Sequence, residues 1–183
     1  MTSWRSSLRG RPGLKKMPEN MKICTYPDPI LRTRSNIVEN IDEDTQILIE
    51  KMAKTMYSAP GIGLAAIQVG EPVRLIVYDL AQWDEARKPS VLINPEIIMA
   101  EGHIVYEEAC LSVLDFSAEV ARSAKIKVRG VDGNGDPVDI EAGDLLAVCL
   151  QHEIDHLNGV LFIDHISSLK RSLYKKRLKK GLE

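Results

Sequence analysis

Gln151-His152-Glu153-Ile154-Asp155-His156 is the stretch around which we expect this protein to be organised. Two histidines four residues apart lie on one face of a helix, because an α-helix turns once in about 3.6 residues. Both imidazoles can bind one divalent metal ion, and Glu153 projects beside them toward a water molecule on that ion. The pattern predicts a metal-dependent hydrolase, and a helix with two incidental histidines is the alternative.

The regions upstream of this motif predict the rest of the core. We expect the motif helix to begin at Gly143-Asp144 and to close at Asn158-Gly159. Before it, Asp132-Gly133-Asn134-Gly135-Asp136 is a hairpin turn that joins residues 125–131 to 138–140 in antiparallel order. Short segments rich in Val and Ile follow one another without helices between them, at residues 73–78, 91–93, 96–99 and 126–129. We predict an α+β fold in which antiparallel sheets pack around a central metal-binding helix.

Two further helices and one helical turn are expected outside this core. Residues 28–31 suggest the turn, and residues 42–59 a helix with one buried side that Pro60-Gly61 ends. Residues 168–180 predict a final helix that carries seven Lys and Arg residues. We therefore divide the chain into an extension at 1–20, a catalytic domain at 21–168 and a basic C-terminal helix at 169–183.

Length and composition fit one compact domain. The chain has 183 residues, of which 44% are hydrophobic, and a net charge of -2. That charge argues against a general nucleic-acid-binding protein, so DNA is not an expected partner. Three cysteines without an apolar leader predict a reducing compartment, and no apolar run approaches the roughly 18 residues of a membrane span. We expect a soluble, cytoplasmic protein that does not bind membranes.

The first residues differ from the rest in composition. Residues 1–16 carry five basic side chains, several serines and no acidic side chain, and we expect 1–20 to be disordered. An organelle transit peptide has this composition, which would place the protein in an organelle. We favour a non-functional extension, because the segment is short for a transit peptide and lacks a clear apolar face.

A catalytic divalent ion needs a third protein ligand and an open position for water. The candidates are the three cysteines, His103, His165 and the carboxylates. Cys149 lies one turn before His152 on the same helix face, but its short side chain does not reach an ion between the two histidines, so we expect it to line the site. Cys110 ends a strand-like segment and can approach from the opposite side. Spacing alone does not prove that it does.

Three segments, in order along the chain, carry the characteristic motifs of one family. They are Gly61-Ile62-Gly63-Leu64-Ala65-Ala66-Ile67-Gln68, Glu108-Ala109-Cys110-Leu111-Ser112 and Gln151-His152-Glu153-Ile154-Asp155-His156-Leu157-Asn158-Gly159. They resemble the motifs of peptide deformylase, over residues 22–170, and together they are highly specific. The resemblance implies an enzyme that removes the N-formyl group from the initiator Met of nascent polypeptides and releases formate.

The resemblance also implies a role for individual residues. The metal ligands would be Cys110, His152 and His156. Glu153 would be the catalytic acid and base, while the side-chain amide of Gln68 and the backbone N–H of Leu111 would stabilise the negative oxygen of the intermediate. A buried pair of Glu108 with Arg122 would brace the Cys110 loop, with a surface position of Arg122 as the alternative.

Substrate contacts are expected along the first motif and beside the metal helix. An extended Gly61-Ile62-Gly63 segment can pair with a peptide main chain, which tolerates any sequence. The substrate-binding residues would be Ile62, Gly63, Ala109, Val148 and Cys149. Ala109 stands where the family usually has Gly, and Leu114 where it commonly has Pro.

The resemblance implies one divalent ion, with Fe²⁺ as the native metal, and Zn²⁺, Ni²⁺ and Co²⁺ also suit a thiolate with two imidazoles. Expected partners are formyl-Met nascent peptides and, through the basic helix at 169–183, the ribosome, whose RNA is polyanionic. A solvated helix face is the alternative for that helix. Two other functions stay open, a zinc metallopeptidase-like hydrolase and an inactive deformylase-like binding protein, which Ala109 makes conceivable.

Overall fold

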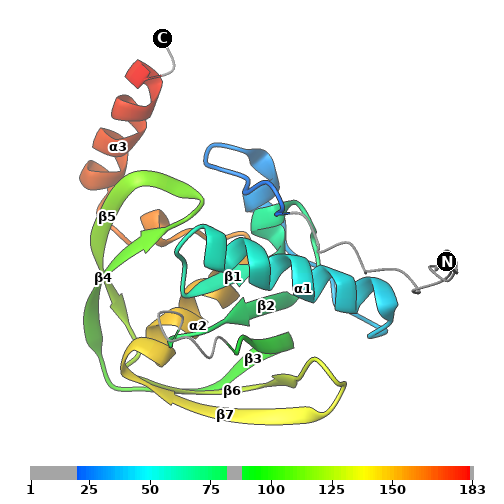
Figure 1. Ribbon diagram of the computed structural model, residues 1–183. Coiled ribbons are helices and arrows are strands. Elements are labelled where there is room, and N and C mark those ends of the chain that lie inside the picture. Colours follow the sequence, from blue (N-terminus) through cyan, green and yellow to red (C-terminus); the bar gives the residue numbers. More distant parts are fainter. Residues whose placement is uncertain (1–19, 82–87, 182–183) are drawn as a thin grey trace, which may run out of the picture.

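The computed structural model describes residues 20–81 and 88–181 (Figure 1). The expected disorder of residues 1–20 lies, apart from residue 20, outside the described residues. The helices are α1 (Glu43–Ser58), α2 (Asp144–Leu157) and α3 (Ser168–Gly181). The strands are β1 (Gly63–Ala65), β2 (Leu75–Tyr78), β3 (Ser90–Glu101), β4 (Ile104–Cys110), β5 (Val113–Arg122), β6 (Lys125–Val131) and β7 (Pro137–Gly143). Short 3-10 turns occur at Pro29–Arg32, Ala66–Val69 and Phe162–Asp164.

The strands form two antiparallel sheets. One has five strands in the order β1-β2-β3-β6-β7, and β4 and β5 form the other. Helix α2 passes between the two sheets, and α1 lies on the side of β1 and β2 (Figure 1). The predicted α+β class, with antiparallel sheets around a central helix and a helix at the C-terminus, is confirmed.

Helix α2 has the predicted limits. Gly143 is its N-cap and Asn158 its C-cap. Gly159 follows with φ 74°, a left-handed conformation that favours glycine. A side chain at this position is excluded for a second reason, because a Cβ atom would lie 2.6 Å from the carbonyl oxygen of Arg32. The end of the metal helix is thereby fixed against the N-terminal part of the chain.

One face of α2 is apolar and fills the main core. Buried side chains of this face, from Ala147, Leu150, Ile154 and Leu157, pack with residues of β2, β3 and β6. On the other side of the five-stranded sheet, Met52 and Met56 of α1 pack against Leu75 and Val77. Burial of these apolar side chains is the main source of stability for such a layered fold.

Two strand expectations need correction. Residues 91–93 and 96–99 belong to one strand, β3, which continues through Asn94-Pro95 by a register shift with Asn94 at φ 52°. Strand β5 was not predicted, because Asp, Ser, Ala and Glu within it have low strand propensity. Its alternation becomes visible only in the fold, where Ala118, Val120 and Arg122 are buried.

Helix α3 extends from the body of the molecule (Figure 1) and is anchored through Tyr174 and Arg177. The Tyr174 side chain is buried, with its ring centroid 4.6 Å from that of Phe116. The Arg177 guanidinium donates to the carbonyl oxygen of Asp115 at 2.7 Å. The helix is therefore docked on the beginning of β5, while most of its Lys side chains are exposed.

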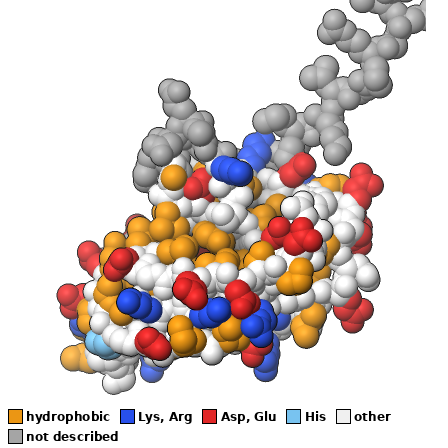
Figure 2. Space-filling model, turned by 90° about the horizontal axis from the view of Figure 1, so that it is seen from below, with side chains coloured by type: hydrophobic (Ala, Val, Ile, Leu, Met, Phe, Trp, Pro, Cys, Tyr) orange, Lys and Arg blue, Asp and Glu red, His pale blue; other side chains and the backbone are white. Residues whose placement is uncertain are grey.

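The surface mixes charges of both signs. On the face seen from below, hydrophobic side chains gather in the middle, with acidic and basic side chains around them (Figure 2). No helix among the described residues is long and apolar enough to cross a membrane.

Candidate active site

A group of three metal-binding side chains lies where α2 faces the end of β4. Cys110, His152 and His156 each offer a ligand atom, and these atoms all lie within 4.8 Å of one another. The Cys110 Sγ is 3.2 Å from Nε2 of His156, which is 3.2 Å from Nε2 of His152. One soft and two borderline donors that converge from two elements suit a divalent transition-metal ion.

The surroundings of the cluster fit a bound ion. The Ser112 N–H and the Gln68 side-chain amide both approach the Cys110 Sγ as donors, at 3.4 and 3.6 Å, which suits a negatively charged sulfur. The Glu153 Oε2 and the His156 Nδ1 are buried without a hydrogen-bond partner among the described residues. A carboxylate oxygen buried in this way normally has a partner, so water or substrate is expected beside it.

Glu108 fixes the first histidine from behind. Its Oε2 lies 2.7 Å from Nδ1 of His152, which leaves Nε2 to face the ion. Arg122 donates to both oxygens of Glu108, at 2.7 and 3.0 Å, and both side chains are buried. Burial would raise the pKa of Glu108, but the hydrogen bonds from His152 and Arg122 outweigh it and lower the pKa to about 2. The predicted Glu108–Arg122 pair is thus present, and the alternative surface position of Arg122 is wrong.

Two residues of the α2 motif have structural roles beyond those predicted from the sequence. The Gln151 amide pairs with the backbone of Ser123 in both directions, at 3.0 Å each, and holds the end of β5 against α2. Asp155 accepts from Arg122 at 2.5 Å. The position of Asp155, three residues after His152 and four after Gln151, is a signal for this arrangement, because side chains three and four positions apart lie on one helix face.

Glu153 lies beside the metal group and against β1. A Cβ atom on Gly63 would come within 2.5 Å of the Glu153 Oε1, so only glycine leaves room for the carboxylate in this position. Burial raises the pKa of Glu153 to about 7. A group that both accepts and returns a proton works best with a pKa near the working pH.

Gln68 is held with its amide nitrogen toward Cys110. Its Oε1 accepts from the Ala65 N–H at 2.8 Å, which fixes the orientation of the amide. Its Nε2 donates to Ser112 Oγ at 3.1 Å, and the side chain is almost fully buried. Leu111, whose backbone N–H was the other predicted donor, follows Cys110 in the wall of the same pocket.

A pocket of about 400 Å³ opens in front of the cluster. Its lining includes all five predicted substrate-binding residues, which are Ile62, Gly63, Ala109, Val148 and Cys149, and adds Leu145 and Tyr106. Cys149 is outside the metal group. Burial raises the pKa of its thiol well above the usual range, so this thiol stays neutral.

Neither residue that departs from the family motif, Ala109 or Leu114, has positive φ. Ala109 lies in β4 opposite Ser117 and does not have positive φ, so its methyl group causes no strain there. Leu114 is 56% exposed at the mouth of a neighbouring hollow, where the next residue, Asp115, has φ 53°. Asp and Asn tolerate this left-handed conformation better than most residues.

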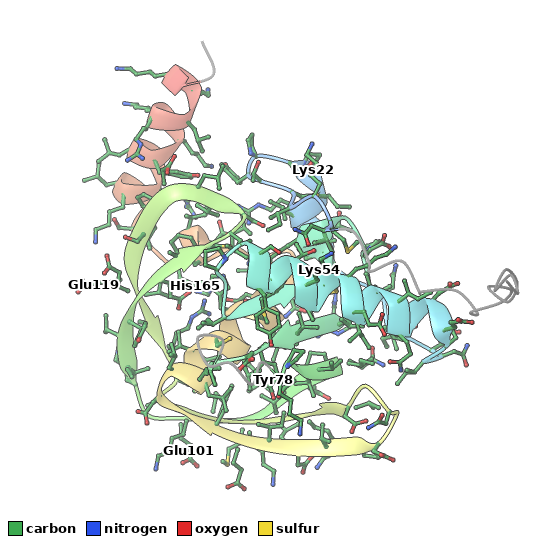
Figure 3. The ribbon with its side chains drawn as sticks, in the orientation of Figure 1. Lys22, Lys54, Tyr78, Glu101, Glu119 and His165 are labelled. Carbon is green, nitrogen blue, oxygen red and sulfur yellow. The ribbon has the colours of Figure 1, made fainter. Side chains whose placement is uncertain are left out.

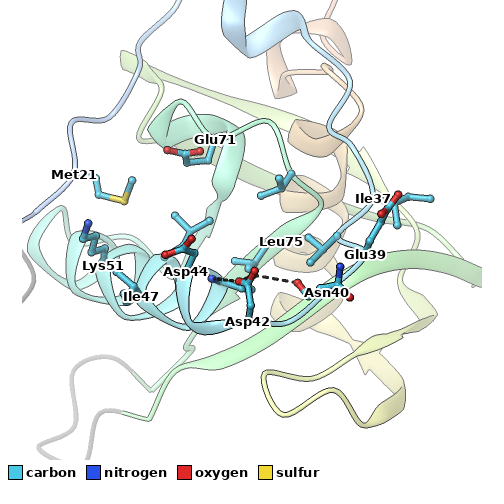
Figure 4. A pocket seen from close by; sticks show the side chains of 14 residues that line it. Met21, Ile37, Glu39, Asn40, Asp42, Asp44, Ile47, Lys51, Glu71 and Leu75 are labelled. Atoms are coloured by element: carbon cyan, nitrogen blue, oxygen red, sulfur yellow. Dashed lines mark hydrogen bonds between the residues drawn. The ribbon is translucent and has the colours of Figure 1, made fainter.

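Another hollow beside α1 contains none of the predicted site residues. It is lined by acidic side chains, among them Glu39, Asp44 and Glu71, together with Lys51 and Met21 (Figure 4). Asp42 at its edge is the N-cap of α1 and accepts from the Thr45 N–H at 2.9 Å. Asp42 and Thr45 therefore serve the helix end, and the chemistry points to the pocket at Cys110.

The chain is similar to known proteins along most of its length. The sequence model described as "Polypeptide deformylase" matches residues 20–172. A peptide deformylase of Mesorhizobium japonicum is 57% identical over 159 residues, which cover 86% of this chain and 90% of the relative. One from Syntrophobacter fumaroxidans is 53% identical over 163 residues, 89% of this chain and 96% of the relative.

Solved structures have the same fold. A crystal structure of a peptide deformylase from Legionella pneumophila superposes with a TM-score of 0.84 at 44% identity, covering 89% of this chain and 95% of that one. The enzyme from Synechococcus elongatus in complex with actinonin gives 0.82 at 41% identity, covering 92% of this chain and 90% of that one.

Proposed function

The chain belongs to the polypeptide deformylase family, metal-dependent hydrolases that remove the N-formyl group from nascent polypeptides, and from that premise we propose that Cys110, His152 and His156 hold its metal ion. The observation that carries the proposal is the convergence of three ligand atoms from β4 and α2 beside a buried carboxylate. A divalent ion bound there would polarise a carbonyl group and lower the pKa of a water molecule toward neutrality. Family membership argues against the metallopeptidase, and the complete set of three ligands together with Glu153 argues against the inactive binding protein.

Glu153 is the proton carrier in this proposal. It takes a proton from the attacking water and returns it to the amine nitrogen as the formyl C–N bond breaks. Two observations support this role. The Glu153 Oε2 is buried without a hydrogen-bond partner among the described residues, and the close approach of Gly63 restricts the position of the carboxylate. One carboxylate can serve both steps, because both proton transfers take place at the same reacting centre.

Gln68 and Leu111 stabilise the oxygen on which negative charge develops. The Gln68 amide is oriented by Ala65, which holds its nitrogen beside Cys110, and substrate would take over one N–H group from Ser112 or Cys110. A donor of this kind commonly contributes about 3 kcal/mol. The backbone N–H of Leu111 would be the second donor. Its position next to Cys110 supports this role.

The peptide substrate binds along β1. Within residues 20–81 and 88–181, this strand is at the edge of the five-stranded sheet and pairs only with β2, so its other edge can accept an added strand. Ile62 and Gly63 would supply the main-chain pairing, beside Ala109 on the opposite wall. Val148 and Cys149 would line the recess for the Met side chain.

We infer that the native ion is Fe²⁺, as the family resemblance implies, although one thiolate and two imidazoles also accommodate Zn²⁺, Ni²⁺ and Co²⁺. Metal analysis of anaerobically purified protein, combined with an assay of formate release from a formyl-Met-Ala peptide, tests this. Zinc as the sole metal in anaerobic, fully active protein would contradict it.

The metal ligands are tested with the two cysteines of the pocket. Cys110→Ala should lower metal affinity by about 100-fold or more, since outer partners alone are typically worth 10- to 100-fold. Cys149→Ala is the matched control and should retain the metal. Equal loss in both variants would mean that Cys110 is not the ligand.

We propose that residues 21–168 are the catalytic domain, that the basic helix at 169–183 binds the ribosome, and that the enzyme works in the cytoplasm, where nascent chains emerge.

Ribosome binding can be tested without removing the helix. Its removal would take Tyr174 out of the core, so substitutions of exposed lysines are the cleaner test. Replacement of Lys175, Lys176 and Lys179 by Gln should weaken salt-dependent co-sedimentation with ribosomes. The same change at the exposed Lys22, Lys88 and Lys125 should not, and equal effects would make α3 only a solvated face.

A further inference from the structure

His165 lies at the outer end of a chain of charged side chains that reaches the metal group. It follows the 3-10 turn Phe162–Asp164 and is seen near the β4–β5 sheet in Figure 3. Its Nε2 is 2.7 Å from Oδ2 of Asp155, the oxygen that also accepts from Arg122. From there the contacts continue through the Arg122–Glu108 pair to Nδ1 of His152.

The side chains of this series that lie nearest the metal group are buried, and the outer ones are partly exposed to water. Side chains of Arg122 and Glu108 are 5% and 4% exposed, whereas those of Asp155 and His165 are 22% and 35% exposed. A surface pocket of about 410 Å³, which His103 also lines, gives water access to this end. Water that competes for Asp155 would weaken its pairing with Arg122, since electrostatic attraction falls as the local dielectric rises.

The turn before His165 is itself rigid. The His165 N–H donates to the carbonyl oxygen of Phe162 at 3.1 Å, and Asp164 accepts from the Leu161 N–H at 2.9 Å. The Phe162 ring is buried, and its centroid is 6.1 Å from that of His152, with 25° between the ring planes. The Phe162–Asp164 turn and the residue after it therefore support His152 in two ways, through the ring of Phe162 and through the contacts that begin at His165.

We propose that His165 is a positioning residue. By holding Asp155 against Arg122, it keeps Glu108 hydrogen-bonded to His152 and so increases the affinity for the metal ion. The inference rests on the proposed ligand set. Partners of metal ligands fix the orientation of the imidazole and raise its basicity, and their influence falls with each further contact.

The test measures binding of Co²⁺ by metal-depleted protein, by competition with a chelator and by the visible spectrum of the Co²⁺ form. His165→Ala should weaken Co²⁺ binding by about threefold, less than the 10- to 100-fold typical of a direct partner, and alter the spectrum. His165→Gln, whose amide nitrogen can reach the place of Nε2, should restore both. His103→Ala is the matched control from the same pocket and should leave both unchanged.

A double variant identifies the route. His165 also approaches Arg122 directly, but with 3.5 Å between its Nε2 and Nη1 of Arg122 this contact is at the limit of a hydrogen bond. In the background of Asp155→Asn, His165→Ala should therefore cause little further loss of Co²⁺ affinity, because His165 acts mainly through Asp155. Full additivity of the two effects, or wild-type affinity and spectrum in His165→Ala, would overturn the proposal. Failure of the ligand set itself would look different, since Cys110→Ala would then keep the Co²⁺ spectrum of the wild-type protein.

Discussion

The two sides of helix α2 do different work. Toward the five-stranded sheet it presents Leu150 and Ile154, which are buried among other apolar side chains. Toward β4 and β5 it presents polar side chains, Gln151, His152 and Asp155, each of which has a hydrogen-bond partner. On the first side, burial of apolar side chains stabilises the fold. On the second side, polar and charged groups lose contact with water, and they are tolerated there because they are paired.

This contrast predicts that substitutions on one side of α2 affect mainly stability, and substitutions on the other side mainly metal binding and turnover. An apolar contact has no direction, so loss of one side chain on the sheet side should lower the free energy of unfolding without redirecting the metal ligands. A buried hydrogen bond fixes an orientation, so a change on the β4–β5 side should alter metal binding or turnover more than stability.

The largest effect is expected for Glu153→Gln. The amide keeps the shape of the side chain but cannot carry the proton, so kcat for formate release should fall by about 1000-fold. The metal content and the unfolding temperature should stay near those of the wild-type protein. A variant with full metal content and near wild-type turnover would remove Glu153 from the mechanism and break the contrast.

The next effect belongs to the apolar side. Leu150 is fully buried, and Leu150→Ala should lower the free energy of unfolding by about 3 kcal/mol through lost burial and the cavity left behind. Urea unfolding measures this, and kcat of the folded fraction should not change. A large loss of metal affinity without loss of stability would mean that the two sides of α2 cannot be separated.

A smaller effect is expected at the boundary between the two sides. Gly63→Ala places a methyl group against the Glu153 carboxylate, which must shift, so kcat/KM should fall about tenfold, equivalent to roughly 1.4 kcal/mol. Gly61→Ala is the comparison, because its methyl group would meet the tip of the Leu111 side chain, which can move. If Gly61→Ala proves the more damaging variant, the space around Glu153 is not what selects glycine.

The smallest effect is expected for Ala109→Gly. Ala109 precedes a register shift in β4 but does not have positive φ, and its side chain is exposed. Reversion should therefore change stability by less than about 1 kcal/mol and leave turnover nearly unchanged. Unfolding curves and formyl-peptide kinetics check this. A tenfold rise in activity would instead show that the methyl group obstructs the substrate.

Local sequence signals predicted the elements that depend on local rules. The limits of α2 follow from Gly143 and Gly159, and the hairpin between β6 and β7 from its Asp and Gly residues. Strand β5 carries no clear local signal, because its residues become a strand only by pairing with β4. The single strand β3 was read as two, since a register shift at Asn94 lies outside simple alternation.

The candidate site divides in the same way. His152, Glu153 and His156 could be placed together from their spacing alone, because a helix fixes which side chains share a face. By itself, therefore, the sequence determined the metal helix, its carboxylate and the α+β class.

Cys110, by contrast, is 42 residues from His152 in the chain, and only the pairing of β4 with β5 brings its sulfur to the imidazoles. The tertiary structure also decided that Arg122 is buried, that Gln151 ties β5 to α2 and that His165 reaches Asp155. Contacts between distant segments depend on how whole elements pack, and spacing along one chain segment carries no record of that packing.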